Sequence, residues 1–299
     1  MKTGRCIYSL LLMMLLMGCK QQTPQDHVLE PCQAVYFWRT DLHLNTTERA
    51  FLKKHHINKV YCRYFDVVMN DDGTEPKPNA TIAFSDTLPH GIALIPTVYI
   101  TEDCMHKSHK GLAQKIVDRI WQMNETNGLE PPCEIQIDCD YTSRSRQLYY
   151  RFLEEVKTSM TGKTQRGRGA LLSTTIRLHQ LAMPAPPADY GVLMVYNTGD
   201  PRQWQARNPI LDYRDVYPYL SKLAAYELPL ATAYPVYQWI RYIENVRVEH
   251  TVSAHEILKV KHALEAERPG LSRAIITYHL ETDNINRYKT ETYEEIYRH

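Results

Sequence analysis

The sequence predicts an α/β protein built as a single (β/α)8 TIM-type barrel, and three observations lead to this prediction. Eight short runs rich in β-branched and aromatic residues follow one another along the chain, as buried strands do. Helical periodicity separates several of these runs, and strands that alternate with helices form a parallel sheet. The chain has 299 residues, which suits a barrel domain of roughly 250 residues. An open doubly wound sheet is the alternative.

The eight runs share their short length and their polar or Pro/Gly boundaries, which mark the points where the chain turns. They cover residues 34–38, 59–66, 92–99, 134–140, 170–176, 192–196, 230–234 and 273–278. Because neighbouring side chains of a strand point to opposite sides, each run should place alternate residues inside the barrel.

The helices between the runs are recognised by their apolar faces and their caps. Apolar residues at helical spacing occur within 112–121, 148–156 and 216–226. Asn45 with Glu48 and Ser253 with Glu256 have the spacing of a capping box. Pro218 falls in the first turn of its predicted helix, where the missing N–H costs little.

Two connections depart from the regular alternation of strand and helix. Residues 69–91, after the second strand, look like a long loop without a helix. Residues 178–189, after the fifth strand, are too short and too rich in proline for a full helix. Residues 236–252 also exceed the length of a normal loop. We therefore expect a barrel with irregular connections after strands 2 and 5.

The first 18 residues predict a lipoprotein signal peptide. Lys2 and Arg5 precede an apolar run over 7–17 that is too short to span a bilayer. Gly18 and Cys19 then match a bacterial lipobox, in which the cysteine sulfur accepts diacylglycerol; a plain signal peptide is the alternative. We expect residues 19–32 to form a tether, 33–299 to form the barrel domain, and Cys19 to anchor it in the cell envelope. The anchored domain would face the periplasm or the cell surface from the outer membrane.

Composition and motifs argue against a nucleic-acid binder and against a protein that holds a metal or another cofactor. The net charge is +1, and nucleic-acid binders usually carry a clear basic excess. The 13 histidines form no zinc-ligand pattern, so we expect no metal, and no motif implies another cofactor. No stretch predicts an oligomer interface, so we expect a monomer. Five of the seven cysteines remain after Cys6 and Cys19, without a disulfide framework, and we expect mostly free, buried thiols.

The fourth run carries the clearest candidates for chemistry. Ile135, Ile137 and Cys139 would face the helices, so Gln136, Asp138 and Asp140 would point into the barrel. Active sites of such barrels lie at the carboxyl ends of the strands. Asp140 would then be a catalytic acid at the rim, and Asp138 would position it or raise its pKa. Alternatively, both carboxylates only satisfy buried arginine or tyrosine groups, and Arg63 and Arg177 are the candidate partners.

Other strand ends also carry side chains that would face a ligand. Besides Arg63, Gln136 and Arg177, these candidate binding residues are Trp38, Asp66, Tyr99, Tyr196, Asn197, Tyr234 and Tyr278. Trp38, Tyr99, Tyr196 and Tyr234 could form an aromatic floor that stacks on sugar rings; alternatively, they are large core residues. Any of the loop carboxylates just past the strand ends could be a second catalytic carboxylate, although most such groups are simply solvated. These are Glu102, Asp103, Asp200, Glu281 and Asp283.

The segment 135–141 and the helix that follows it resemble the fourth strand of glycoside-hydrolase-like barrels. The segments 171–175 and 193–196 fit the fifth and sixth strands of these barrels. The chain resembles an uncharacterised family of such barrels in bacterial lipoproteins. More distantly it is similar to the chitinase-type glycoside hydrolases, whose fourth strand has the pattern D-x-D-x-E and whose sixth has M-x-Y.

This resemblance implies roles for some residues and puts one in doubt. Asp138 and Asp140 match the two aspartates of the pattern, and Met194 and Tyr196 match the sixth strand. The position of the acidic Glu falls on Thr142, which cannot act as a carboxylic acid. We therefore expect a lipid-anchored glycoside-hydrolase-like barrel that acts on a polysaccharide or glycan outside the cytoplasm by carboxylate chemistry. The alternative is a non-catalytic barrel that binds a glycan or another envelope component.

Overall fold

The computed structural model confirms the predicted (β/α)8 barrel. It describes residues 29–165, 168–200, 202, 207–243 and 246–299. Eight parallel strands form one sheet that closes on itself, because β1 pairs with both β15 and β3. These strands are β1 (Cys32–Phe37), β3 (Lys59–Met69), β6 (Ala93–Ile100), β7 (Glu134–Cys139), β10 (Leu171–Arg177), β11 (Tyr190–Met194), β12 (Leu230–Pro235) and β15 (Ala274–Tyr278). Each overlaps one of the eight predicted runs.

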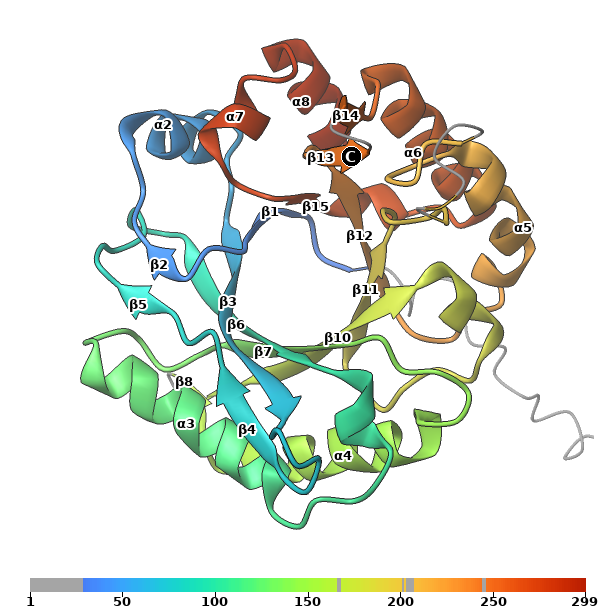
Figure 1. The fold of residues 1–299 in the computed structure, drawn as a ribbon. Helices are drawn as coiled ribbons and strands as arrows, with labels where there is room; N and C mark the ends of the chain where they lie inside the picture. The colour runs from blue at the N-terminus through green and yellow to red at the C-terminus, as the bar shows by residue number, and fades with distance from the viewer. Residues whose placement is uncertain (1–28, 166–167, 201, 203–206, 244–245) are drawn as a thin grey trace, which may run out of the picture.

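Helices surround the barrel as an outer layer (Figure 1). They are α2 (Thr46–Lys54), α3 (Leu112–Thr126), α4 (Arg146–Met160), α5 (Tyr213–Leu223), α6 (Ala254–Glu267), α7 (Thr282–Ile285) and α8 (Thr290–Tyr297). The apolar faces predicted for α3 and α4 are buried against the strands, where burial of apolar area stabilises the fold.

The caps agree with the sequence in part. Asn45 and Glu48 form the complete capping box at the start of α2. The Ser253 side chain accepts from the Glu256 N–H, but the Glu256 carboxylate accepts from the Tyr213 N–H at 2.6 Å and so joins α6 to α5. Because α5 begins at Tyr213, Pro218 lies inside this helix rather than in its first turn.

Both irregular connections are present. After β3, the chain forms β4 (Pro76–Asn79), antiparallel to β3, and β5 (Ala83–Phe84), which pairs with β2 (Asp41–Leu42). After β10, a 3₁₀ helix, η3 (Leu178–Ala182), replaces a full helix. The long segment after β12 is a hairpin of β13 (Gln238–Ile243) and β14 (Val246–Thr251). The remaining short elements are β8 (Thr164–Gln165), β9 (Arg168–Gly169), η2 (Glu102–Met105) and η5 (Leu271–Arg273).

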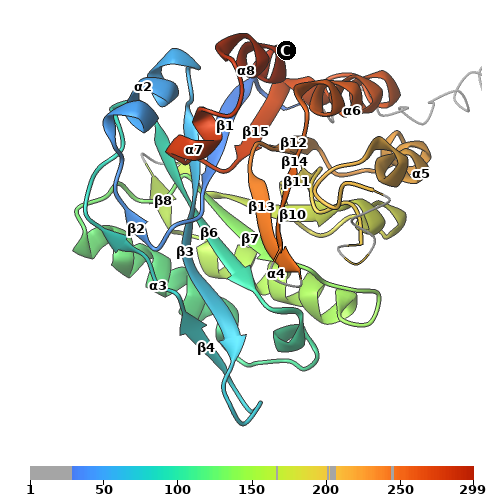
Figure 2. The same cartoon turned by 45° about the horizontal axis from the view of Figure 1, so that its top comes forward.

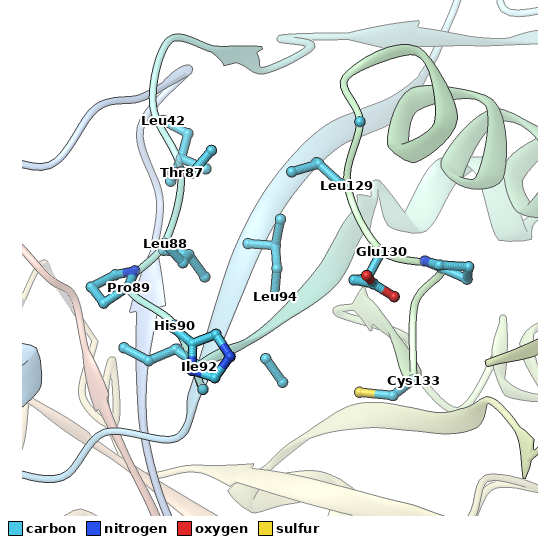
Figure 3. A pocket seen from close by; sticks show the side chains of 14 residues that line it. Leu42, Thr87, Leu88, Pro89, His90, Ile92, Leu94, Leu129, Glu130 and Cys133 are labelled. Carbon is cyan, nitrogen blue, oxygen red and sulfur yellow. The ribbon is translucent and has the colours of Figure 1, made fainter. Parts of the chain in front are cut away.

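The connection without a helix leaves a hollow on the outer wall of the barrel. It has a volume of about 570 Å³ and lies between the segment that leads into β6 and the segment that leads into β7. Figure 3 shows Leu88, Leu94 and Leu129 around this apolar space, with Cys133 at its lower end. Leu94 belongs to β6 and is only half-buried. Most of the residues that line the hollow precede β6 or β7, so it lies near the amino ends of these two strands.

Polar side chains fill the barrel interior near the amino ends of the strands. Glu134 accepts hydrogen bonds from Lys59 Nζ at 2.7 Å, from Ser173 Oγ at 2.6 Å and from the Tyr190 hydroxyl. The hydroxyl groups of Tyr190 and Tyr61 lie 2.6 Å apart. We call these five residues the base cluster. Every member has a partner, as buried polar groups require.

The amino-terminal predictions lie largely outside the described residues. The signal peptide over 1–18, the lipidated Cys19 and the tether up to residue 28 fall in this part of the chain. Within the described ranges, no helix is long and apolar enough to cross a membrane. The five described cysteines are free thiols, and Cys62, Cys104 and Cys139 are buried.

Candidate functional site

The candidate site lies at the carboxyl ends of the barrel strands, which we call the mouth. The alternation predicted for β7 is present: Gln136 and Asp138 point into the barrel, where they contact side chains of other strands. Asp140 follows the last residue of β7 and lies at the rim. Its side chain is 48% exposed, whereas that of Asp138 is 4% exposed. The two carboxylates therefore differ sharply in their access to water.

Arg177, the last residue of β10, joins both carboxylates. Its Nε lies 2.5 Å from Oδ1 of Asp140, and its Nη2 lies 3.1 Å from Oδ1 of Asp138. Its Nη1 contacts the sulfur of Met194. Thr175 Oγ1 donates a further hydrogen bond of 2.6 Å to Asp138. We call Asp138, Asp140 and Arg177 the mouth charge cluster. Of the two candidate arginine partners, Arg177 is the one that pairs with these aspartates.

Burial controls the electrostatics of this cluster. It raises the pKa of Asp138, and repulsion from Asp140 adds to this effect, while Arg177 opposes it. Burial by itself would lower the pKa of Arg177, but the two aspartates outweigh this effect and raise it. Burial and the same two carboxylates raise the pKa of Tyr99 to about 12, so this tyrosine is a neutral hydrogen-bond donor at the rim. Perturbed groups of this kind are typical of functional sites, although structural ion pairs perturb pKa values too.

Arg63 and Asp66 form a second ion pair at the mouth because β3 carries a bulge. Residues three apart in a regular strand face opposite sides, but the register shifts between Arg63 and Phe65. Arg63 is therefore the neighbour of Thr97 and Asp66 the neighbour of Tyr99, on the same face of the sheet. Arg63 Nε donates to Asp66 Oδ1 at 2.7 Å, and both side chains are largely buried.

Aromatic rings line the side of the mouth opposite β7. Tyr278 stacks on Tyr196 with ring centres 4.8 Å apart and meets Trp38 at 5.9 Å. The Arg63 guanidinium lies 5.7 Å from the centre of the Trp38 ring. Trp38, Tyr99 and Tyr278 are half-buried, whereas Tyr196 is 7% exposed. Three of the four residues predicted as the aromatic floor thus lie at the mouth, together with Tyr278.

The fourth of these residues, Tyr234, lies on the outer face of the barrel. It is the register partner of Thr277, whose hydroxyl bonds to Tyr297 of α8 at 2.7 Å. The next pair, Pro235 and Tyr278, faces the mouth. Tyr234 is 1% exposed, so it is a core residue beneath the helices and has no access to a ligand at the mouth.

Gln136 and Asn197 are placed differently from the rest of the predicted set. Gln136 is fully buried below Asp138, and its Oε1 accepts from the Tyr36 hydroxyl at 2.8 Å. It therefore supports the floor of the mouth and does not reach the rim. Asn197 is exposed, has a φ of 53°, and accepts a 2.5 Å hydrogen bond from the Tyr237 hydroxyl.

Two further aromatic residues at the mouth were not predicted from the sequence. Together with Trp38, Tyr196 and Tyr278, they form what we call the aromatic wall. Tyr36 packs against Trp38, Tyr61 and Tyr278, and Tyr237 packs edge-to-face against Tyr278 at 5.4 Å. Tyr36 could have been found, because it precedes Trp38 by two positions and shares its side of β1. Tyr237 follows the end of β12 by two residues, so strand alternation gave no signal for it.

Thr142, the position where the resemblance places an acidic Glu, binds a carboxylate instead of supplying one. Its Oγ1 donates to Glu102 Oε1 at 2.9 Å, and Ser145 Oγ donates to the same oxygen at 2.6 Å. His106 Nε2 lies 2.8 Å from Glu102 Oε2. These hydrogen bonds hold the pKa of Glu102 below its usual range. Glu102 thereby ties the loop after β6 to the loop that carries Asp140.

Metal ligation has no support among the residues that the structure describes. In these ranges, no three His, Cys, Asp or Glu side chains are grouped to hold an ion. The mouth instead offers carboxylates, guanidinium groups and aromatic rings. Such a set can bind hydroxyl-rich rings and transfer protons to or from them.

Comparisons with known proteins find similarity at the level of structure. No protein-family model matches the chain, and no curated protein matches its sequence. The spore cortex-lytic enzyme SleL of Bacillus cereus matches with 15% identity over 90% of this chain and 74% of its own, with a TM-score of 0.55.

A chitinase from Bacteroides thetaiotaomicron matches with 12% identity over 90% of this chain and 96% of its own, with a TM-score of 0.58. The chitinase-like agglutinin RobpsCRA of Robinia pseudoacacia matches with 11% identity over 88% of this chain and 99% of its own, with a TM-score of 0.55. At these identities the likeness concerns the fold. The chain thus has a (β/α)8 barrel fold that is distantly similar to the fold of chitinase-type enzymes.

Proposed function

We propose that this protein is a lipid-anchored barrel that binds a glycan at its mouth, outside the cytoplasm. One observation carries the proposal: half-buried aromatic rings stand beside charged groups at the carboxyl ends of the strands. Trp38, Tyr99 and Tyr278 offer faces for the apolar side of a sugar ring. The mouth charge cluster offers acceptors and donors for sugar hydroxyl groups. The glycoside-hydrolase-like fold supports the same class of ligand.

We further propose that the bound glycan is hydrolysed, with Asp140 as the acid. Asp140 is the exposed carboxylate of the cluster, so its oxygen can reach a glycosidic oxygen at the mouth. It would donate its proton to that oxygen as the bond to the sugar carbon breaks. A water molecule would then bond to that carbon and return a proton to the Asp140 carboxylate. Asp138 would position Asp140 from below, because Arg177 bonds to both carboxylates. In its pair with Arg177, the Asp140 carboxylate accepts a hydrogen bond, whereas a catalytic acid must donate one. Binding of the ligand would therefore have to draw Asp140 away from Arg177.

The second candidate is a barrel that binds a glycan without cleaving it. It is favoured by Arg177, which engages both aspartates, and by Thr142, which stands where the chitinase-type pattern has its acid. The likeness to a chitinase-like agglutinin is consistent with it. In this case the mouth charge cluster would only shape the site and bond to sugar hydroxyl groups.

Hydrolysis is tested first. The barrel domain without Cys19, as wild type and as Asp140→Asn, is incubated with a broad panel of polysaccharides and glycans, and new reducing ends and product masses are measured. Cleavage that Asp140→Asn abolishes supports the hydrolase with this acid. Cleavage that survives the change keeps the hydrolase and rejects Asp140. Binding without any cleavage across the panel favours the second candidate.

Binding is tested on the same panel with variants of the aromatic wall. Trp38→Ala should weaken binding about tenfold or more, since one stacked ring contributes on the order of 1–2 kcal/mol. Tyr217→Ala is the matched control, because Tyr217 is an exposed tyrosine on α5, away from the mouth. Equal affinity of both variants for every bound glycan would reject the mouth as the binding site.

The anchor is tested separately. We expect the full chain expressed in a bacterial envelope to carry lipid, detected by its mass and by its partition into detergent. Cys19→Ser should lose both properties. A wild-type protein that is processed but carries no lipid would contradict the anchor and leave the glycan proposal unaffected.

A further inference from the structure

We infer that the glycan bound at the mouth carries a free amino group on a sugar ring, and that its ammonium form pairs with the two aspartates of the mouth charge cluster. We rest this inference on the proposed glycan site, and it names the class of sugar that this site takes. It does not require that the glycan is cleaved.

Three neighbouring strands bring the groups of this site together at the rim. Figure 2 shows β6, β7 and β10 running side by side, and β7 pairs with both of the other strands. Tyr99 on β6 is the register partner of Asp138 on β7. Two nitrogen atoms of the Arg177 guanidinium bond to Oδ1 of Asp138 and to Oδ1 of Asp140. The two carboxylates therefore lie next to each other.

Each of the two aspartates keeps one oxygen atom without a hydrogen-bond donor. Arg177 and Thr175 donate to Oδ1 of Asp138, and Arg177 donates to Oδ1 of Asp140. Among the residues that the structure describes, none donates to Oδ2 of either side chain. The Asp138 side chain is only 4% exposed and points into the barrel just below the rim. A buried acceptor without a donor costs free energy, so a ligand that supplies donors here is favoured.

Positive groups at the mouth do not balance the two aspartates. Within the described ranges, Arg177 is the one cation that pairs with these carboxylates. The Arg63 guanidinium is already paired with Asp66. His179 and His279 follow β10 and β15, and burial lowers the pKa of both. Neither histidine therefore adds a positive charge near neutral pH.

A neutral glycan would leave this imbalance in place. When a ligand covers the mouth, it removes water from the carboxylates, and a buried charge without a partner costs free energy. Burial and repulsion from Asp140 already raise the pKa of Asp138. An ammonium group supplies one positive charge and three N–H donors. It thus matches both the surplus carboxylate and the two oxygen atoms without donors.

Aromatic rings beside the cluster suit the same ligand. Tyr99 is half-buried, and its ring stands next to the two aspartates. The face of an aromatic ring attracts the apolar side of a sugar and also a nearby cation. A glucosamine-type unit offers both, whereas an N-acetylated unit is neutral and has a single N–H donor. An ammonium beside Asp140 favours the ionised carboxylate, so this ligand fits binding without cleavage better than acid catalysis by Asp140.

Two matched ligands test this preference. The full chain, held in detergent, is titrated with a tetrasaccharide of β-linked glucosamine and with its N-acetylated form. The buffer is kept just below neutral pH, so that the sugar amines are largely protonated. Calorimetry measures both affinities. The amine form should bind about tenfold more tightly or better, because charge-assisted hydrogen bonds are the stronger kind.

Asp140→Asn should bring the two affinities close together, because it removes the surplus negative charge. Asp118→Asn is the matched control: Asp118 is a similarly exposed aspartate on α3, and its loss changes the net charge of the chain equally. This control should keep the preference for the amine form.

Three results would overturn the inference and leave the glycan site standing. In the first, wild type binds the N-acetylated form as tightly as the amine form or more tightly. In the second, Asp140→Asn keeps the preference for the amine. In the third, wild type binds neither tetrasaccharide but binds another glycan. If no glycan binds at all, the proposed function is contradicted together with the inference.

Discussion

Strand β7 carries carboxylates at both ends of the barrel interior, and the two ends hold them differently. At the base, Glu134 is 1% exposed and bonds to Lys59, Ser173 and Tyr190. At the mouth, Asp138 and Asp140 share one cation, Arg177, and Asp140 remains half-exposed. The base cluster is closed, with all its partners supplied by the protein. The mouth charge cluster has an open side, where a ligand can supply partners.

This difference separates stability from function along one strand. A closed set of buried partners gains nothing from a ligand, so its effect is on folding. An ion pair at an open rim contributes little to stability but can exchange its partners when a ligand binds. We therefore expect changes at the base to alter the free energy of unfolding, and changes at the rim to alter ligand binding or chemistry.

Glu134→Ala should have the largest effect on the free energy of unfolding. The change removes the acceptor of Lys59, Ser173 and Tyr190 and leaves a cavity in the barrel. Loss of one partner of a buried ion pair costs about 3–5 kcal/mol, and urea denaturation measures it. Glu134→Gln keeps an oxygen acceptor and should cost less. A loss below about 1 kcal/mol for Glu134→Ala would show that the base cluster does not stabilise the barrel as described.

Arg177→Met should lower the free energy of unfolding by a smaller amount than Glu134→Ala. Among the residues that the structure describes, Thr175 is then the one hydrogen-bond donor left to the buried Asp138, but water can enter from the mouth where the guanidinium stood. We expect a loss of about 2 kcal/mol, the cost of an incompletely satisfied buried group. Arg177→Met combined with Asp138→Asn should recover part of the loss in the same denaturation experiment. Two losses that simply add would show that the two side chains are not coupled.

The pH dependence of stability should distinguish Asp138 from ordinary carboxylates. Its folded-state pKa is raised, mainly by burial. The folded state therefore holds this proton more tightly than the unfolded state, whose aspartates titrate near pH 3.9. The contribution of Asp138 to the free energy of unfolding is fully present below that pH, and it is lost as the pH rises through the folded-state pKa.

Asp86 provides the opposite case within the same chain. Its hydrogen bond with Arg49 is the main cause that lowers its pKa to about 2, so its contribution is present above pH 3.9 and is lost as the pH falls through about 2. Denaturation midpoints of wild type and Asp138→Asn, measured from pH 3 upward, isolate the Asp138 contribution. A difference between the two proteins that does not change with pH would contradict the raised pKa.

The sequence was sufficient for the barrel and for the direction of most site residues. Eight runs with turn boundaries give eight strands, and alternation along β7 correctly predicts the inward direction of Gln136 and Asp138. It fails for Tyr234 because both faces of a buried parallel strand are apolar, so the run 230–234 does not reveal which side faces the mouth. The extra residue in β3, which brings Arg63 beside Asp66, leaves no mark in the pattern.

The partner of the two aspartates also required the structure. Arg63 and Arg177 each follow or lie near a strand end, and both are compatible with the sequence. The choice depends on which strands are neighbours: β10 pairs directly with β7, whereas β3 is separated from β7 by β6. Similarly, the contact between Glu102 and Thr142 joins loops 40 positions apart, and no local pattern predicts such a pair.

The smallest effect on stability is expected for Asp140→Asn. Its side chain is half-exposed, and exposed ion pairs contribute about 0–1 kcal/mol. Removing one carboxylate also relieves its repulsion of Asp138, which offsets part of the loss. The denaturation midpoint should therefore stay close to that of wild type. If it does, any loss of cleavage in this variant reflects the chemistry at the mouth, whereas a loss of stability as large as that of Arg177→Met would make Asp140 a structural residue.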